Sequence, residues 1–155
     1  MNISKDKVEI FKRSLGIATK TIGRKKKTEI SFINDNPRIN GNLVSLKEPP
    51  KDISYSNISS IRGEADSIGT QIRYHDNKIH SKYINKDSSA EKIFSSLEKS
   101  RCEALGSNEL RGVLKNITSN FNSWNKKGSN ETCAEYCHDC AISNYSSYFC
   151  SNFTK

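Results

Sequence analysis

The apolar positions of residues 4–22 recur at intervals of three and four, which predicts an amphipathic helix. Its inward face carries Val8, Phe11, Leu15, Ala18 and Ile22. Ser4 is a suitable N-cap, and Gly23 is a suitable end for this helix. Because Ile10 and Ile17 lie off the inward face, we expect the helix to be packed rather than free.

A short strand region is predicted after the basic run at residues 24–27. Residues 28–33 alternate in polarity, with Ile30 and Phe32 on one side, which is typical of a half-buried strand. A turn at residues 34–37 follows, and then Asn40-Gly41 predicts a type I′ hairpin, because both residues tolerate positive φ. Two prolines, Pro49 and Pro50, close the strand region, since neither can donate to a strand ladder.

The clearest helical period in the chain lies between residues 58 and 72. An apolar seam about four turns long is formed by Ile58, Ile61, Ala65, Ile68 and Ile72. Gly63 and Gly69 each cost about 1 kcal/mol relative to alanine inside a helix. We therefore expect these glycines to mark a close approach of a neighbouring element.

Two further helices are predicted downstream of the seam. One begins at Ser88, which forms a capping box with Glu91, and is expected to end at Gly106. Its predicted apolar side carries Ala90, Phe94, Leu97, Ala104 and Leu105. A weaker helix is predicted at residues 108–121.

After about residue 120 the periodicity fails, and serine, asparagine and cysteine dominate. The sequence therefore predicts a domain at residues 1–127 and an irregular tail at residues 128–155. The expected fold class is α+β, predominantly α-helical, with a small N-terminal β-hairpin or sheet and a disordered C-terminal tail.

Length and charge restrict the class of protein. A chain of 155 residues suits one domain with or without a tail, and no apolar run approaches the roughly 20 residues that span a bilayer. The N-terminus lacks the pattern of a signal peptide, so we expect a cytoplasmic protein. Residues 1–27 carry nine basic and two acidic residues. This segment could bind nucleic acid or an anionic membrane, or could be a solvated face; no aromatic stacking platform accompanies it.

The cysteines of the predicted tail have a spacing known from metal sites. Cys133, Cys137 and Cys140 are spaced as in radical-SAM iron–sulfur enzymes, but the fifteen residues after Cys140 are too few for the barrel that such chemistry needs. A zinc site that adds Cys150 or His138 is stereochemically possible, and a fortuitous thiol cluster is the alternative. Disulfides are not expected in a cytosolic chain.

Residues 52–56 match D-x-S-x-S, the first loop of a metal-ion-dependent adhesion site, in which a carboxylate and two hydroxyls face Mg²⁺. Such a loop normally follows a buried strand, and residues 47–51 cannot form one. The alternative interpretation is a solvated helix start with Ser54 or Ser56 as N-cap.

His75, Asp76 and His80 are a candidate metal or acid–base cluster, since histidine titrates near neutrality. His75 is explained equally well as a histidine at a helix C-terminus. Arg62 and Asp66 are four residues apart and predict a surface ion pair. No Ser/His/Asp triad, glycine-rich phosphate loop or H-E-x-x-H motif is present, so no catalytic or cofactor-binding residue is assigned.

Several segments of the chain carry a family resemblance. The most specific are R-G-E-A-D at residues 62–66, H-D at 75–76 and L-E-K-S-R-C-E-A-L-G at 97–106. The others are residues 11–15, 29–32, 41–50, 61, 73–74, 80 and 111–113. In the same order, these segments resemble the N-terminal region of the CobT family of cobaltochelatase subunits, and the resemblance covers roughly residues 8–120.

This resemblance implies a subunit of an ATP-dependent complex that inserts Co²⁺ into hydrogenobyrinic acid a,c-diamide during cobalamin biosynthesis. Its partners would be an AAA+ ATPase subunit and a large tetrapyrrole-binding subunit, which together handle ATP, Mg²⁺ and cobalt. The family's metal site lies in a C-terminal von Willebrand A-type domain, whereas this sequence ends at Lys155, so we expect a truncated form without cofactors or a self-contained active site. The alternatives are a small basic nucleic-acid-binding protein with a zinc-binding cysteine tail and a decayed fragment without activity.

Overall fold

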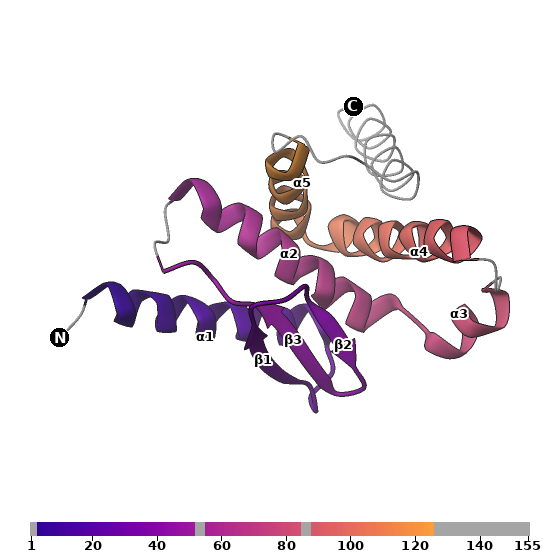
Figure 1. Cartoon of the computed structure of the whole chain (residues 1–155), viewed down its shortest axis with the longest axis horizontal. Helices are drawn as coiled ribbons and strands as arrows, with labels where there is room; N and C mark the ends of the chain where they lie inside the picture. Colours follow the sequence, from indigo (N-terminus) through magenta and orange to yellow (C-terminus); the bar gives the residue numbers. More distant parts are fainter. Residues whose placement is uncertain (1–2, 52–54, 85–87, 126–155) are drawn as a thin grey trace.

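The computed structural model of the chain describes residues 3–51, 55–84 and 88–125, and places five helices and three strands there. In order they are α1 (Ile3–Gly23), β1 (Glu29–Ile33), β2 (Arg38–Asn40), β3 (Leu43–Lys47), α2 (Tyr55–Tyr74), α3 (Asn77–Tyr83), α4 (Ser88–Glu109) and α5 (Arg111–Asn125) (Figure 1). The predicted α+β class, mostly helical with a small sheet near the N-terminus, is confirmed. The tail predicted at residues 128–155 lies outside the described residues. Within the described ranges, none of the helices combines the length and the apolar character needed to cross a membrane.

Helix α1 packs as its sequence period predicts, with one correction. Leu15 and Ile22 are buried, and the helix contacts α2. Ile10 and Ile17, however, are 66% and 59% exposed, so these two isoleucines do not pack the helix. They lie on the side of α1 that faces away from α2 and the core, and an apolar residue on that side remains in contact with water.

The three strands form one sheet with β3 in the centre, in the order β1-β3-β2. β2 and β3 form the predicted hairpin, with Asn40 opposite Leu43. β1 pairs parallel to β3, with Glu29 opposite Leu43. Because β3 has a neighbour on both edges, its middle residues are buried, whereas β2 is exposed throughout.

The predicted type I′ turn of the hairpin is wrong. Gly41 has φ 60°, and Arg24 is the one non-glycine residue with positive φ in the described part of the chain. Neither Asn40 nor Asn42 therefore adopts a left-handed conformation. A single positive φ at the first central position is the geometry of a type II′ turn, for which glycine is the preferred residue.

Helix α2 runs through the middle of the molecule, between α1 with the sheet and the pair α4 and α5 (Figure 1). The predicted seam is confirmed: Ala65, Ile68 and Ile72 are buried, and Ile58 and Ile61 are partly buried. The principal core lies between α1, α2 and the sheet, and its buried residues are Leu15, Val44, Leu46, Ala65, Ile68 and Ile72.

The close approach predicted at Gly63 and Gly69 is also confirmed. A Cβ on Gly63 would lie 2.1 Å from the carbonyl oxygen of Asn116 in α5, and one on Gly69 would lie 2.9 Å from Cγ2 of Ile22 in α1. Both separations are too short for real atoms. The glycines therefore let the neighbouring helices reach the backbone of α2, and this contact offsets their poor helix propensity.

Helix α4 differs from its prediction at two positions. It continues through Gly106 to Glu109, because Gly106 faces α2, where a Cβ would lie 2.2 Å from Cγ2 of the buried Thr70. Gly106 therefore serves close packing and not helix termination. Leu97, predicted on the apolar side, is 46% exposed. The capping box at Ser88 involves a side chain outside the described part.

The last predicted helix is confirmed with shifted bounds. α5 covers Arg111–Asn125 in place of residues 108–121. Its residues Val113 and Ile117 are buried together with Ile22 of α1 in a second, smaller core.

The predicted surface ion pair of Arg62 and Asp66 is wrong, because Asp66 is only 3% exposed. Nδ2 of Asn116 donates a hydrogen bond to the Asp66 carboxylate over 2.8 Å and so ties α2 to α5. Burial raises the pKa of Asp66 above its ordinary value of 3.8, although this hydrogen bond and the charge of Arg62 oppose the rise.

This raised pKa predicts how stability depends on pH. The folded state binds the Asp66 proton more tightly than the unfolded state does, so the contribution of Asp66 to stability is complete below about pH 4 and is lost as pH rises through the folded pKa. We expect Asp66→Asn, which keeps an acceptor for Asn116 without a buried charge, to lack this loss. Urea denaturation of both proteins across a pH series measures the difference, which should grow in favour of the variant with rising pH. A difference that is constant with pH would contradict this assignment.

Candidate functional site

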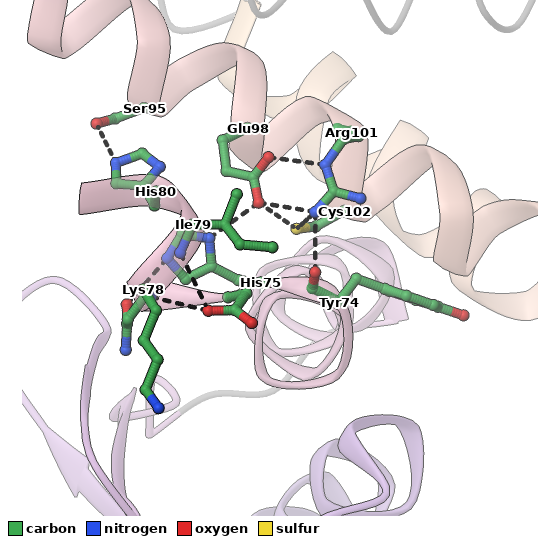
Figure 2. Close-up of polar contacts among 11 residues, drawn as sticks. Tyr74, His75, Lys78, Ile79, His80, Ser95, Glu98, Arg101 and Cys102 are labelled. Carbon is green, nitrogen blue, oxygen red and sulfur yellow. Dashed lines mark hydrogen bonds and ion pairs between the residues drawn. The ribbon is translucent and has the colours of Figure 1, made fainter. Parts of the chain in front are cut away.

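A polar cluster forms where the end of α2, helix α3 and the middle of α4 meet (Figure 2). His75 follows directly after α2, and Asp76 is the N-cap of α3: its carboxylate accepts hydrogen bonds from the backbone N–H groups of Lys78, at 2.8 Å, and Ile79, at 3.2 Å. This cap lets α3 begin with only two residues between it and α2, and so brings His80 back toward His75. The site is therefore built by a local turn.

Helix α4 supplies the opposite side of the cluster. Glu98, Arg101 and Cys102 are spaced by three and four residues, so they share one face of the helix. This face is directed toward His75 and the end of α2 (Figure 2). The two sides of the cluster thus come from separate parts of the chain.

Glu98 is the centre of the hydrogen-bond network. His75 donates from Nδ1 to Oε1 of Glu98 over 2.9 Å. Arg101 donates from Nε to Oε2 over 2.7 Å and from Nη2 to Oε1 over 2.8 Å, a bidentate pair. Nη2 of Arg101 also donates to the backbone carbonyl of Tyr74 over 2.8 Å. The carboxylate therefore links the end of α2 to α4.

Electrostatics fixes the protonation states of two members of the cluster. The hydrogen bonds from Arg101 and His75 lower the pKa of Glu98 to about 2, against the opposing effect of burial. Burial, followed by the negative charge of Glu98, raises the pKa of Cys102 to about 12. At neutral pH Glu98 is therefore a paired carboxylate and Cys102 a protonated thiol. This state suits neither general acid–base catalysis by Glu98 nor nucleophilic attack by Cys102.

His80 extends the cluster along α3. Its ring centroid lies 4.9 Å from that of His75 and 4.9 Å from that of Phe94. Nε2 of His80 is 3.5 Å from the hydroxyl oxygen of Ser95, whereas Nδ1 is buried and has no hydrogen-bond partner among the described residues. A histidine nitrogen in this position remains available as a donor atom for a ligand.

The structure thus brings together two of the three residues that the sequence singled out here. His75 and His80 are in ring contact, whereas Asp76 serves as a helix cap. The position of His75 directly after α2 also fits its alternative interpretation as a helix C-terminal histidine. Sequence reasoning missed Glu98 and Cys102 as site residues, although they are four residues apart on one predicted helix and lie in the L-E-K-S-R-C-E-A-L-G segment.

One group of metal-ligating side chains is present within the described residues. His75, Glu98 and Cys102 each offer one ligand atom, and these atoms all lie within 4.8 Å of one another. Cys102 Sγ is 3.7 Å from Glu98 Oε1. The other metal candidates of the sequence, residues 52–54 of the D-x-S-x-S loop and the tail cysteines Cys133, Cys137, Cys140 and Cys150, lie outside the described residues.

The basic N-terminal segment is partly neutralised by neighbouring acids. Nζ of Lys12 pairs with Glu48 at 2.9 Å and with Glu9 at 3.4 Å, and lies 5.0 Å from the ring centroid of Phe32. Next to it, an open groove of about 630 Å³ runs along α1. Its lining residues are Asp6, Glu9, Ile10, Lys12, Arg13, Ser14, Ile17 and Phe32.

The motifs that carry the family resemblance lie at contacts between helices. In R-G-E-A-D, Gly63 and Asp66 contact α5 through Asn116. In L-E-K-S-R-C-E-A-L-G, Glu98 bonds His75, and Glu103 accepts a hydrogen bond from Ser67 of α2. These motifs therefore specify how α2 packs against α4 and α5.

Fold and motifs together define a class: a mostly helical α+β protein whose recognisable residues join a central helix to its neighbours. A family model described as "Cobalamin biosynthesis protein CobT" matches residues 5–137. The chain therefore belongs to the CobT family, a cobaltochelatase subunit of cobalamin biosynthesis, and corresponds to the N-terminal region of that subunit. No solved structure matches the chain.

Proposed function

We propose that the chain is an accessory subunit of the ATP-dependent cobaltochelatase that inserts cobalt into hydrogenobyrinic acid a,c-diamide. The family match over residues 5–137 carries this proposal. The paired Glu98 and the protonated Cys102 support a role in assembly, because neither side chain is an activated acid, base or nucleophile. In this proposal the protein acts in the cytoplasm, and its partners handle ATP, Mg²⁺ and the cobalt substrate.

The outer face of α1 is the surface that we assign to the AAA+ ATPase subunit. Ile10 and Ile17 are exposed there, and exposed Arg13 and Lys20 continue the same stripe at helical spacing. A stripe that alternates isoleucine and basic side chains fits a partner surface that is both apolar and acidic. Asp6 and Glu9 line the same groove, which favours a protein partner over an anionic membrane or nucleic acid.

The test measures assembly and activity with purified subunits. The full chain should bind the ATPase subunit and, with the large subunit present, support ATP-dependent cobalt insertion. We expect Ile10→Glu combined with Ile17→Glu to weaken ATPase binding roughly 100-fold, because two charges would be placed in the apolar centre of the interface. Both positions are exposed, so the fold should be unchanged.

Ile79→Glu is the matched control, because Ile79 of α3 is 58% exposed and lies on a different element. This control variant should bind the ATPase subunit as the unmodified chain does. Unchanged binding in the α1 double variant would show that another surface docks the partner. Salt-sensitive binding to DNA without binding to either subunit would refute the assembly role itself.

A further inference from the structure

We propose that His75, Glu98 and Cys102 form a binding site for a divalent transition-metal ion of the Zn²⁺ or Co²⁺ type. The three ligand atoms lie within 4.8 Å of one another, one from the end of α2 and two from adjacent turns of α4. In Figure 2 the three side chains converge on the space between α2 and α4. This inference is independent of the proposed function, because it concerns an ion that the chain itself holds.

The separations suit a small ion after a minor adjustment. Zinc–ligand bonds of about 2.0–2.3 Å place tetrahedral ligand atoms roughly 3.3–3.8 Å apart. Sγ of Cys102 is already 3.7 Å from Oε1 of Glu98, whereas Nδ1 of His75 is at hydrogen-bond distance, 2.9 Å, from the same oxygen. A rotation of the imidazole and carboxylate that opens this hydrogen bond would make room for the ion.

The donor set selects the kind of ion. An imidazole, a thiolate and a carboxylate are ligands that zinc and cobalt prefer over Mg²⁺ and Ca²⁺, which take oxygen ligands. The ring of His80 packs against that of His75 at the edge of this group. With three protein ligands, the fourth coordination position would be open to water.

Binding replaces the hydrogen bonds of Glu98 with His75 and Cys102 by metal bonds. The Cys102 thiol loses its proton to solvent as the Sγ–metal bond forms. Nδ1 of His75 also gives up its proton, while Nε2 takes one up and donates it to Oδ1 of Asn77, 3.0 Å away, so the net release is one proton per ion. The guanidinium of Arg101 must give up at least one oxygen of Glu98. The Arg101 side chain is 49% exposed, so it can turn toward water without leaving a buried charge unpaired.

The test titrates Co²⁺ into the full chain in which Cys133, Cys137, Cys140 and Cys150 are replaced by serine, so that Cys102 is the only thiol. We expect one saturable site with a thiolate-to-cobalt charge-transfer band. Zn²⁺ should abolish this band by competition, and Mg²⁺ should have no effect. Proton release in weak buffer should equal one per ion.

Variants separate a metal site from a hydrogen-bonded contact between helices. Cys102→Ser should remove the charge-transfer band, and His75→Gln should weaken Co²⁺ binding roughly 100-fold or more. Arg101→Gln should strengthen binding, because it frees Glu98, whereas a purely structural contact would give no metal affinity in any variant. Glu91→Gln, at an exposed position on the same helix, is the matched control and should bind as the parent does.

Absence of saturable Co²⁺ binding, or a charge-transfer band that survives Cys102→Ser, would overturn the proposal. Circular dichroism checks that each variant folds; if Cys102→Ser does not, unchanged affinities of His75→Gln and Arg101→Gln overturn it equally. Binding of the ATPase subunit is measured separately in chelator-treated protein. Failure of the metal site would then be distinguishable from failure of the assembly role.

Discussion

Replacement of Gly63 by alanine should destabilise the protein by about 3 kcal/mol, at the upper end of typical overpacking costs. The new Cβ would lie 2.1 Å from the carbonyl oxygen and 2.7 Å from the carbonyl carbon of Asn116. Both are backbone atoms, so only a shift of α5 away from α2 relieves the clash. That shift would also stretch the hydrogen bonds from Asn116 to Asp66 and from Ser60 to Asn120.

Gly112→Ala is the matched control for this substitution. Gly112 also lies in a helix, α5, but a Cβ there would meet no atom within 4 Å. Alanine is the better helix former by up to about 1 kcal/mol, so the control should be neutral or stabilising. Urea denaturation of both variants measures the contrast, and equal effects at the two glycines would refute the close packing of α2 on α5.

Leu46→Ala should destabilise the protein by about 3 kcal/mol, within the range for a large-to-small change in a core. Leu46 is buried in the central strand β3 and belongs to the core between the sheet, α1 and α2. Removal of its side chain would leave a cavity between the sheet, α1 and α2. We expect the surrounding elements not to collapse far enough to fill it. The free energy of unfolding from urea denaturation checks the value.

The matched control is Leu97→Ala on α4. Leu97 is chemically identical and was predicted by its helical spacing to face the core, but almost half of its side chain is exposed. We expect its truncation to change stability by less than about 0.5 kcal/mol. A loss at Leu97 as large as that at Leu46 would contradict the exposure of Leu97 on α4.

The segments that resemble the CobT family contain glycines that pack against neighbouring helices. Gly63 and Gly106 both lie in segments that identify the CobT family, and both face a neighbouring helix at a distance that excludes a methyl group. A substitution at either position changes how the helices fit. These two glycines therefore serve the packing of α2 against its neighbouring helices.

The candidate site could be predicted only in part. The sequence placed His75 near His80, because the two histidines are only four intervening residues and a turn apart. It could not place Glu98, which lies 23 residues from His75. A contact between two helices depends on their relative rotation and offset, and neither quantity is encoded in the period of one helix. The sequence therefore gives no sign that Glu98 joins the two histidines.

The sequence by itself determined the properties that repeat along a single element, namely the amphipathic period of α1 and the seam of α2. These depend on the angle between successive side chains, which is fixed by local backbone geometry. It also indicated the close approach at Gly63 and Gly69, because glycine has a poor helix propensity. Only the tertiary structure decided the parallel pairing of β1 with β3, the burial of Asp66, the exposure of Ile10 and Ile17, and the continuation of α4 through Gly106. Each of these features depends on which two surfaces come into contact. The free energy gained by burial is set by both surfaces together, so the sequence of one element does not determine it.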